Sequence, residues 1–139
     1  MIKEVLAGKI NPYLASDVEL KQGQLVKLDP ANVGKVIAAG AGDAVVGFVA
    51  QDVIAANVDN YKLDSVTHQA RVGDKVGVYF GGGVFLTDMF VGNITVPGTK
   101  LYAGAGGKMT ATASGNAVAE AETVGNAANG DEIRIKALV

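Results

Sequence analysis

Residues 73–80 read GDKVGVYF, in which a glycine and an aspartate lead into apolar residues at every second position. A glycine beside a small polar residue favours a turn with positive φ, and apolar residues of period two are typical of a half-buried strand. The same unit recurs in residues 23–28 (GQLVKL), 98–102 (GTKLY) and 130–135 (GDEIRI). Each unit therefore predicts a turn that leads into a β-strand.

Three glycines follow this first stretch at positions 81–83, and a second apolar run covers residues 84–90. Two strand-forming runs separated by a short glycine-rich segment are typical of a β-hairpin. Apolar side chains fall on both faces of both runs. The sequence therefore predicts a hairpin, formed by residues 75–90, that is covered on two sides.

Two longer segments resemble each other, residues 23–45 and residues 98–118. The first has glycines at 23, 34 and 42, the second has them at 98, 107 and 115, and a strand-forming pair or triplet follows each glycine. Both segments read as strand, turn, strand, turn, strand. We interpret them as a structural pseudo-repeat, which is too short for a solenoid because a solenoid needs at least three stacked units.

The composition of the 139 residues excludes several classes of protein. A mean hydropathy of +0.27 with a net charge of −2 is the opposite of intrinsic disorder. The chain has no cysteine, so it has no disulfide, zinc-thiolate site or thiol nucleophile. Twelve basic residues against fourteen acidic ones, without a basic run, give no footprint for nucleic acid.

The apolar runs are short and interrupted. Residues 44–50 (AVVGFVA) are among the longest, far below the roughly 20 residues of a membrane helix, and Glu4 interrupts the N-terminal segment where a secretory signal needs an apolar stretch. We therefore expect no membrane partner, and a soluble protein that is made in a cytoplasm.

Few residues are suited to catalysis. His68 is the single histidine, the serines are Ser16, Ser65 and Ser114, and none stands in a nucleophile-elbow or metal-ligand pattern. The glycine-rich residues 40–42 and 104–107 precede strands rather than helices, so they are turns and not phosphate-binding loops. We expect no catalytic residue, no cofactor and no metal site, and hence not an enzyme.

Residues 1–20 contain Pro12 and little periodicity, and we interpret them as an N-terminal arm. Residues 21–139 are expected to form a single β-rich domain. The predicted fold class is all-β, a small antiparallel β-barrel or sandwich of about 8–10 short strands.

The large apolar side chains point to an interface. Alanine, valine and glycine bury little area each, so we expect further burial to come from association. The candidate interface residues lie in the arm and around the predicted hairpin: Ile2, Val5, Leu6, Ile10, Tyr13, Leu14, Tyr79, Phe80, Phe85, Met89 and Phe90. The alternative for the last five is that they form the core of the subunit.

Taken in order, these strand and turn segments resemble a known family. The segments are residues 23–26 (GQLV), 34–36 (GKV), 45–50 (VVGFVA), 73–76 (GDKV), 98–102 (GTKLY), 107–110 (GKMT) and 131–135 (DEIRI). Their succession resembles that of tailed-bacteriophage capsid decoration, or cement, proteins. The resemblance covers residues 20–139 and rests on the spacing of turns and strands.

This resemblance implies a structural virion protein on the outer surface of an icosahedral head. It implies that the protein is a homo-oligomer, with a trimer preferred over a dimer, that it bridges neighbouring major capsid subunits, and that it stabilises the shell. The arm would then serve attachment. The alternative function is a β-rich ligand-binding module of the carbohydrate type, or another structural interaction module. A carbohydrate module would need exposed aromatic platforms, and the chain has no tryptophan and only four tyrosines.

Overall fold

The computed structural model describes residues 1–6, 8–55 and 69–139. In this part of the chain the regular elements are strands and two short 3₁₀ helices, η1 (Ala105–Gly107) and η2 (Ala127–Asn129). The strands are β1 (Ile2–Leu6), β2 (Lys9–Ala15), β3 (Leu25–Leu28), β4 (Val36–Ala38), β5 (Gly47–Val49), β6 (Val53–Ile54), β7 (Ala70–Arg71), β8 (Lys75–Phe80), β9 (Val84–Thr87), β10 (Asn93–Ile94), β11 (Lys100–Ala103), β12 (Met109–Thr110), β13 (Ala117–Ala121), β14 (Gly125–Asn126) and β15 (Ile133–Ala137).

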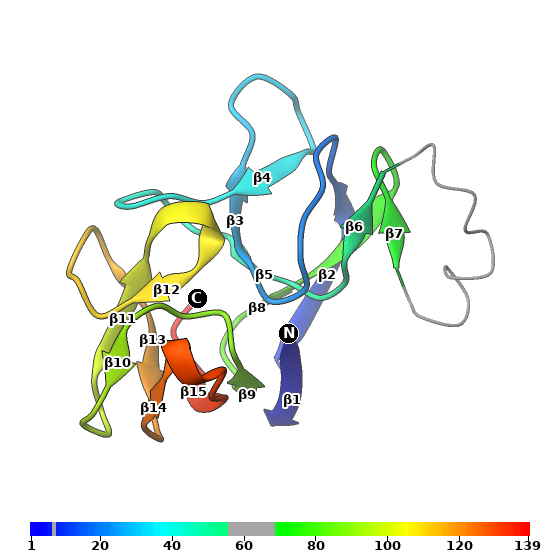
Figure 1. Cartoon of the computed structure of the whole chain (residues 1–139). Coiled ribbons are helices and arrows are strands. Elements are labelled where there is room, and N and C mark those ends of the chain that lie inside the picture. The colour runs from blue at the N-terminus through cyan, green and yellow to red at the C-terminus, as the bar shows by residue number, and fades with distance from the viewer. Residues whose placement is uncertain (7, 56–68) are drawn as a thin grey trace.

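Two larger sheets organise these strands (Figure 1). Sheet A has six strands in the order β1-β9-β15-β13-β11-β12, and sheet B has five in the order β2-β8-β5-β3-β4. All neighbours within sheets A and B are antiparallel, and two-stranded ribbons β10–β14 and β6–β7 flank them. The all-β prediction is confirmed, and the arrangement is sandwich-like without a closed barrel.

The described residues form two hydrophobic cores, one on each side of sheet B. Core 1 joins the inner face of sheet A to Leu25 and Phe48 of sheet B. Core 2 contains Val26 and Val49, the next residues along the same two strands, and is completed by Leu20 and by β6 and β7. Because successive side chains of a strand point to opposite faces, sheet B is buried on both sides.

The hairpin predicted from residues 75–90 does not form. β8 pairs with β2 and β5 in sheet B, whereas β9 pairs with β1 and β15 in sheet A, so the glycines at 81–83 carry the chain from one sheet to the other. All three have positive φ. A turn formed by three such glycines is not bound to the twist of a two-stranded hairpin, and each run finds its partners elsewhere.

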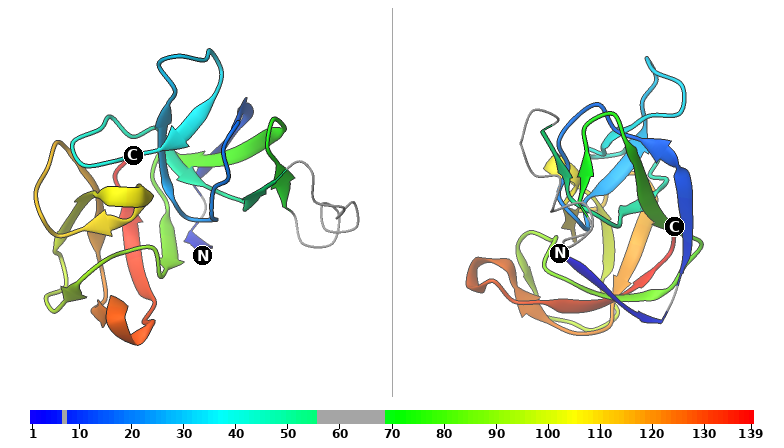
Figure 2. Two further views of the ribbon diagram at one scale, coloured as in Figure 1. Left: turned by 45° about the horizontal axis from the view of Figure 1, so that its top comes forward. Right: turned by 90° about the vertical axis from the view of Figure 1, so that its right-hand side faces the viewer.

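The N-terminal residues cross between the sheets at the same place. β1 pairs with β9, and β2 pairs with β8, so the two crossings run side by side in opposite directions (Figure 2). A Cβ built on Gly83 would lie 2.8 Å from the N of Gly8 and 3.0 Å from the O of Leu6. Glycine is therefore required where the two backbones pass.

The expectation that residues 1–20 stand outside the β pattern is wrong. They form β1 at one edge of sheet A and β2 at one edge of sheet B, and Ile2 and Ala15 are buried. Their weak periodicity has a physical cause, since each strand contains a register shift, between Glu4 and Leu6 in β1 and between Asn11 and Leu14 in β2. A bulge interrupts the period-two pattern by which a strand is recognised.

The pseudo-repeat is confirmed and extends beyond the predicted segments. Sheet B has the order β2-β8-β5-β3-β4, and β9-β15-β13-β11-β12 of sheet A follows the same path through a second copy of the unit. Equivalent turns make equivalent bonds, since the N–H of Gly23 donates to the O of Val49 (2.8 Å) and that of Gly98 to the O of Ala121 (2.6 Å). The described chain is therefore β1 followed by two copies of one unit, the first from β2 to β8 and the second from β9 to β15.

Candidate interaction surface

The structure separates the predicted interface residues into two groups. Ile2, Phe85, Met89 and Phe90 are buried within the subunit, and Leu14 and Tyr79 are half-buried. The exposed group, with the exposed fraction of each residue, consists of Val5 (53%), Leu6 (64%), Ile10 (49%), Tyr13 (78%) and Phe80 (38%).

The buried residues are core residues, which corrects the interface prediction for them. Phe85 of β9 lies between the two sheets, with its ring centroid 6.0 Å from that of Phe48 and 5.0 Å from that of Tyr79. Met89 and Phe90 follow β9 and are covered by the rest of the described chain. Their concentration in the sequence marks the joint between the sheets, because large side chains fill the space between two packed layers.

The exposed group gathers along the N-terminal strands. β1 and β2 are edge strands of different sheets, each with one neighbouring strand. Ala15, at the end of β2, is bridged to Lys35, and its N–H donates to the O of Gly34 (3.1 Å), so residues 2–6 and 9–14 present a strand edge without a partner strand among the described residues. We call this the N-terminal edge. An open edge offers backbone donors and acceptors to another chain, and Val5, Leu6, Ile10 and Tyr13 add apolar contact area to it.

Part of this edge is blocked by its own local structure. Pro12 has no N–H, and the N–H of Tyr13 donates to Oδ1 of Asn11 (3.0 Å) at the bulge of β2. The ammonium group of Lys75 donates to the carbonyl oxygen of Tyr13 (2.9 Å). The stretch of β2 that remains free for strand pairing is therefore Lys9–Asn11.

A groove of about 390 Å³ lies against β2, on the face of sheet B that is turned toward core 1. Its lining residues are Ile10, Pro12, Ala50, Gln51, Lys75, Val76, Gly77 and Tyr79. Ile10 and Tyr79 are paired across β2 and β8, so both side chains lie on this face. Gly77 has no side chain, which leaves the floor of the β2 groove open.

Tyr79 links this groove to β1. Burial, followed by the hydrogen bond and the negative charge of Glu4, raises the pKa of Tyr79 to about 12. The phenol therefore stays protonated and donates to the Glu4 carboxylate. This contact ties the start of the chain to β8, across the two sheets.

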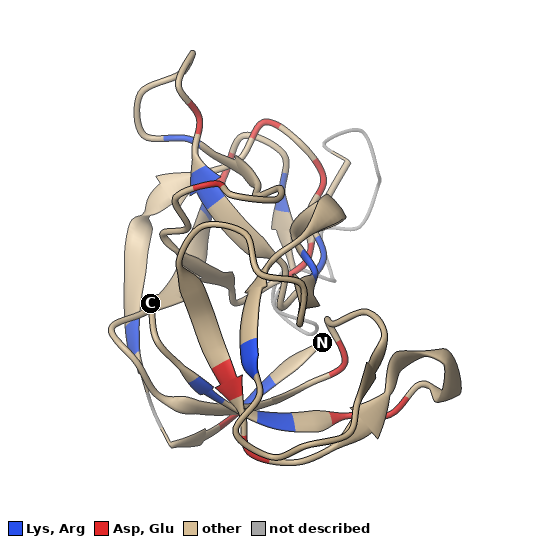
Figure 3. Ribbon diagram, turned by 90° about the vertical axis from the view of Figure 1, so that its left-hand side faces the viewer, with Lys and Arg blue, Asp and Glu red and all other residues tan. Residues whose placement is uncertain are grey.

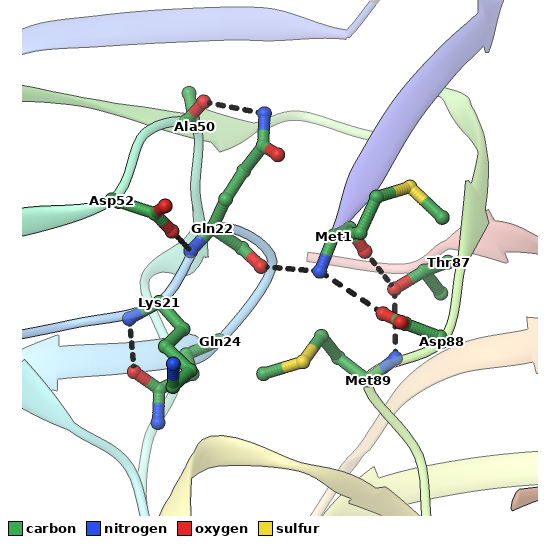
Figure 4. A network of polar contacts seen from close by, with 9 residues as sticks. All are labelled: Met1, Lys21, Gln22, Gln24, Ala50, Asp52, Thr87, Asp88 and Met89. Carbon is green, nitrogen blue, oxygen red and sulfur yellow. Dashed lines mark hydrogen bonds and ion pairs between the residues drawn. The ribbon is translucent and has the colours of Figure 1, made fainter. Parts of the chain in front are cut away.

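A network of polar contacts fixes the beginning of β1 (Figure 4). The Met1 ammonium group donates to the O of Gln22 (2.8 Å) and forms an ion pair with Oδ1 of Asp88 (3.0 Å). The buried Thr87 hydroxyl donates to the O of Met1 (2.6 Å) and accepts from the N–H of Met89 (3.1 Å). Nothing in the sequence marks Thr87 or Asp88 for this role, because their partners are distant in the chain.

A second hollow, of about 470 Å³, lies beside β6 and is lined by Glu19, Leu20, Lys21, Gln24, Asp52, Val53, Ile54 and Gln69. Within residues 1–6, 8–55 and 69–139, no cluster of three or more His, Cys, Asp or Glu side chains is arranged to hold a metal ion. His68 and Ser65, which the sequence singles out, lie outside the described residues.

Charged residues of both signs are interspersed on the surface (Figure 3). The outer face of sheet A carries the pairs Lys100–Glu120 (2.8 Å) and Arg134–Glu122 (3.2 Å). The Lys100 hydrogen bond and charge lower the pKa of Glu120. Such exposed pairs add little to stability, and they keep this face of sheet A in contact with water.

In the part of the chain that is described, no helix is both long and apolar enough to cross a membrane.

Comparison with known proteins finds a similar fold among solved structures. No protein-family model matches the chain, and no curated protein matches its sequence. Among solved structures, it is similar to the N base of the head fiber protein gp8.5 of bacteriophage phi29, with a TM-score of 0.60 and 12% identity. The match covers 99% of this chain and 94% of that chain. The whole of this chain therefore shares its fold with the base of a phage head fiber.

Proposed function

We propose that this chain is a structural protein of a bacteriophage virion, located on the outside of the head. The observation that carries the proposal is the fold shared, over 99% of the chain, with a part of a phage head fiber. The segment pattern along residues 20–139, which resembles that of capsid decoration proteins, supports the same role. In this role the chain is not an enzyme and needs no metal or cofactor.

The partner that we propose is the major capsid protein. The N-terminal edge supports this proposal, because it exposes four large apolar side chains beside unpaired strand backbone. A contact of standard size buries about 1,600 Å², and the many equivalent sites of one shell multiply the effect of each contact. Bridging of neighbouring capsid subunits and stabilisation of the shell are the expected consequences.

Self-association belongs to the same proposal, and a homotrimer is the preferred state. Apolar side chains that remain exposed in the single subunit are the reason to expect it. Light scattering at micromolar concentration should give a mass that is a multiple of 14.1 kDa, the mass of one chain. A single species of the monomer mass would contradict the proposed oligomer without touching the virion location.

The proposed function is tested with virus particles. Purified chain is mixed with heads of the virus that encodes it, prepared from a mutant lacking this chain, and bound protein is measured after sedimentation. We expect saturable binding that is unchanged by a chelator and falls only modestly with salt, because apolar area and backbone pairing supply most of the affinity. Absence of binding, or of the chain from wild-type virions, would refute the proposal.

A further inference from the structure

The two copies of the unit differ at one edge. In sheet A, β9 carries β15 on one side and β1 on the other. Its equivalent in sheet B, β2, carries β8 on one side, and on the other side its only pairing among the described residues is the bridge from Ala15 to Lys35 at its end. We propose that β2 accepts one extended strand from a partner polypeptide, antiparallel to β2, in the position that β1 occupies beside β9. β1 is the example, within the molecule itself, of how such a strand is held.

The β2 groove gives this added strand a place for a side chain. A strand beside β2 places every second side chain on the face of Ile10 and Tyr79, next to the groove of about 390 Å³. The missing side chain of Gly77 and the small one of Ala50 leave room there. The occupant is therefore expected to carry a large apolar residue at the position opposite Ile10.

The partner is a different chain rather than a second copy of this one. Two β2 strands paired about a two-fold axis could pair only along Lys9–Asn11, because Pro12 has no N–H and the N–H of Tyr13 is already bonded to Asn11. Such a pair would also bring the positive charges of Lys9 and Lys75 of both copies to one edge, where like charges repel. Pairing is available along Lys9–Asn11, so a short strand segment that enters from this end fits better.

The charges at the edge favour an acidic occupant. Lys9 and Lys75 stand at the two ends of the paired part of β2 and β8, and among the described residues neither forms an ion pair with a carboxylate. Lys75 donates to a backbone oxygen of Tyr13 instead. The occupant that matches this edge is an extended segment with an apolar residue flanked by aspartate or glutamate.

This inference rests on the proposed function, since the partner that offers the segment is the major capsid protein. The test uses the heads without this chain and full-length variants. Gly77→Val fills the floor of the groove, where an added Cβ would lie 3.3 Å from Cγ2 of Ile10 and 3.4 Å from Cβ of Ala50. Ile10→Glu places a negative charge at the edge, and the matched control is Val91→Glu, at a valine of the other repeat that is 42% exposed, against 49% for Ile10.

We expect Gly77→Val and Ile10→Glu to keep the wild-type melting temperature to within a few degrees and to weaken binding at least about tenfold, while Val91→Glu binds as wild type. Hydrogen exchange at the amides of Lys9–Asn11 should slow in the bound state. If the wild-type chain binds and all three variants bind equally well, the added strand is refuted and the virion role stands. If the wild-type chain does not bind, the proposed function falls and the added strand falls with it.

Discussion

At the scale of the residue, single polar groups hold distant segments together. The Thr87 hydroxyl satisfies two backbone groups, the O of Met1 and the N–H of Met89, within a fully buried site. A buried polar group that loses its partner costs more than the hydrogen bond contributes, because its desolvation is no longer compensated. Such positions are therefore more sensitive to substitution than their exposed neighbours.

Thr87→Val keeps the shape of the side chain and removes both hydrogen bonds. We expect the free energy of unfolding to fall by about 1–3 kcal/mol. Urea denaturation measures the change, and Thr87→Ser, which keeps the hydroxyl, should lose less. A Thr87→Val variant as stable as wild type would show that neither bond contributes.

Tyr79 should give the protein a transition at high pH. Its pKa is raised to about 12 in the folded state, chiefly by burial. Because the folded state holds this proton more tightly than the unfolded state does, the associated stability is complete below pH ~10 and is lost as the pH rises toward 12. Absorbance at the phenolate band should show a component that titrates late and is absent in Tyr79→Phe. A titration curve that is the same in the wild type and in Tyr79→Phe at pH above ~10 would contradict the burial of this phenol.

At the scale of the element, the fold depends on two connections between sheet A and sheet B, the one from β1 to β2 and the one from β8 to β9. β1 and β2 pass β8 and β9 beside Gly8 and Gly83. A side chain at Gly83 would meet the backbone of Gly8 and Leu6, and one at Gly8 would meet the carbonyl oxygen of Gly82. Because of these glycines, the turn between β8 and β9 connects the two sheets and does not form a hairpin.

Gly83→Ala tests the close approach. Gly83 has φ 106°, and its added Cβ would crowd Gly8 and Leu6, whereas Gly73 has φ 94° and open space around it. Gly73→Ala should therefore lower the free energy of unfolding by the backbone strain alone, about 1–2 kcal/mol, and Gly83→Ala should lower it clearly more. Thermal unfolding of the two variants compares them, and equal losses would mean that the crossing is not tightly packed.

Removal of residues 1–8 tests whether they act as an edge strand of sheet A or as a free arm. The deletion takes Ile2 out of core 1, leaves β9 without β1 and removes the acceptor of the Thr87 hydroxyl. We expect a loss of more than about 3 kcal/mol, against less than ~0.5 kcal/mol for the exposed substitution Leu6→Ser. An unchanged melting temperature after the deletion would restore the interpretation of these residues as an arm.

At the scale of the whole molecule, the two copies of one unit are stacked. The face of sheet A that carries Leu101 and Ile135 packs on the face of sheet B that carries Leu25 and Phe48. Core 1 lies at this contact, while the small ribbon β6–β7 covers core 2 of the first copy. The outer face of sheet A carries charged residues and ends the stack, as polar outer faces do in repeat proteins.

Acid should destabilise the molecule through carboxylates in both copies. Hydrogen bonds from Asn32 and Ala31 lower the pKa of Asp29, the N–H of Gly40 followed by Lys27 lowers that of Asp43, and Lys100 lowers that of Glu120. Lowered values in the folded state mean that their contribution is present above the ordinary carboxyl pKa of roughly 4 and is lost as the pH falls below it. The free energy of unfolding should fall with acid, less so in an Asp29→Asn, Asp43→Asn, Glu120→Gln triple variant. A pH-independent wild type would contradict this.

The sequence by itself determined the strands and the repeat, because period-two apolar runs and glycine turns are local signals. Which face of each strand is buried was decided only in the tertiary structure. The ladder Leu25–Phe48–Tyr79–Ile10 across sheet B and its counterpart Lys100–Glu120–Lys136–Val84 across sheet A occupy equivalent positions. The first is apolar because the second copy of the unit packs on it, and the second is charged because water covers it. The partners of β1, β2, β8 and β9 were likewise beyond local reasoning, since strand pairing joins residues far apart in the chain and a glycine turn leaves the choice of partner open.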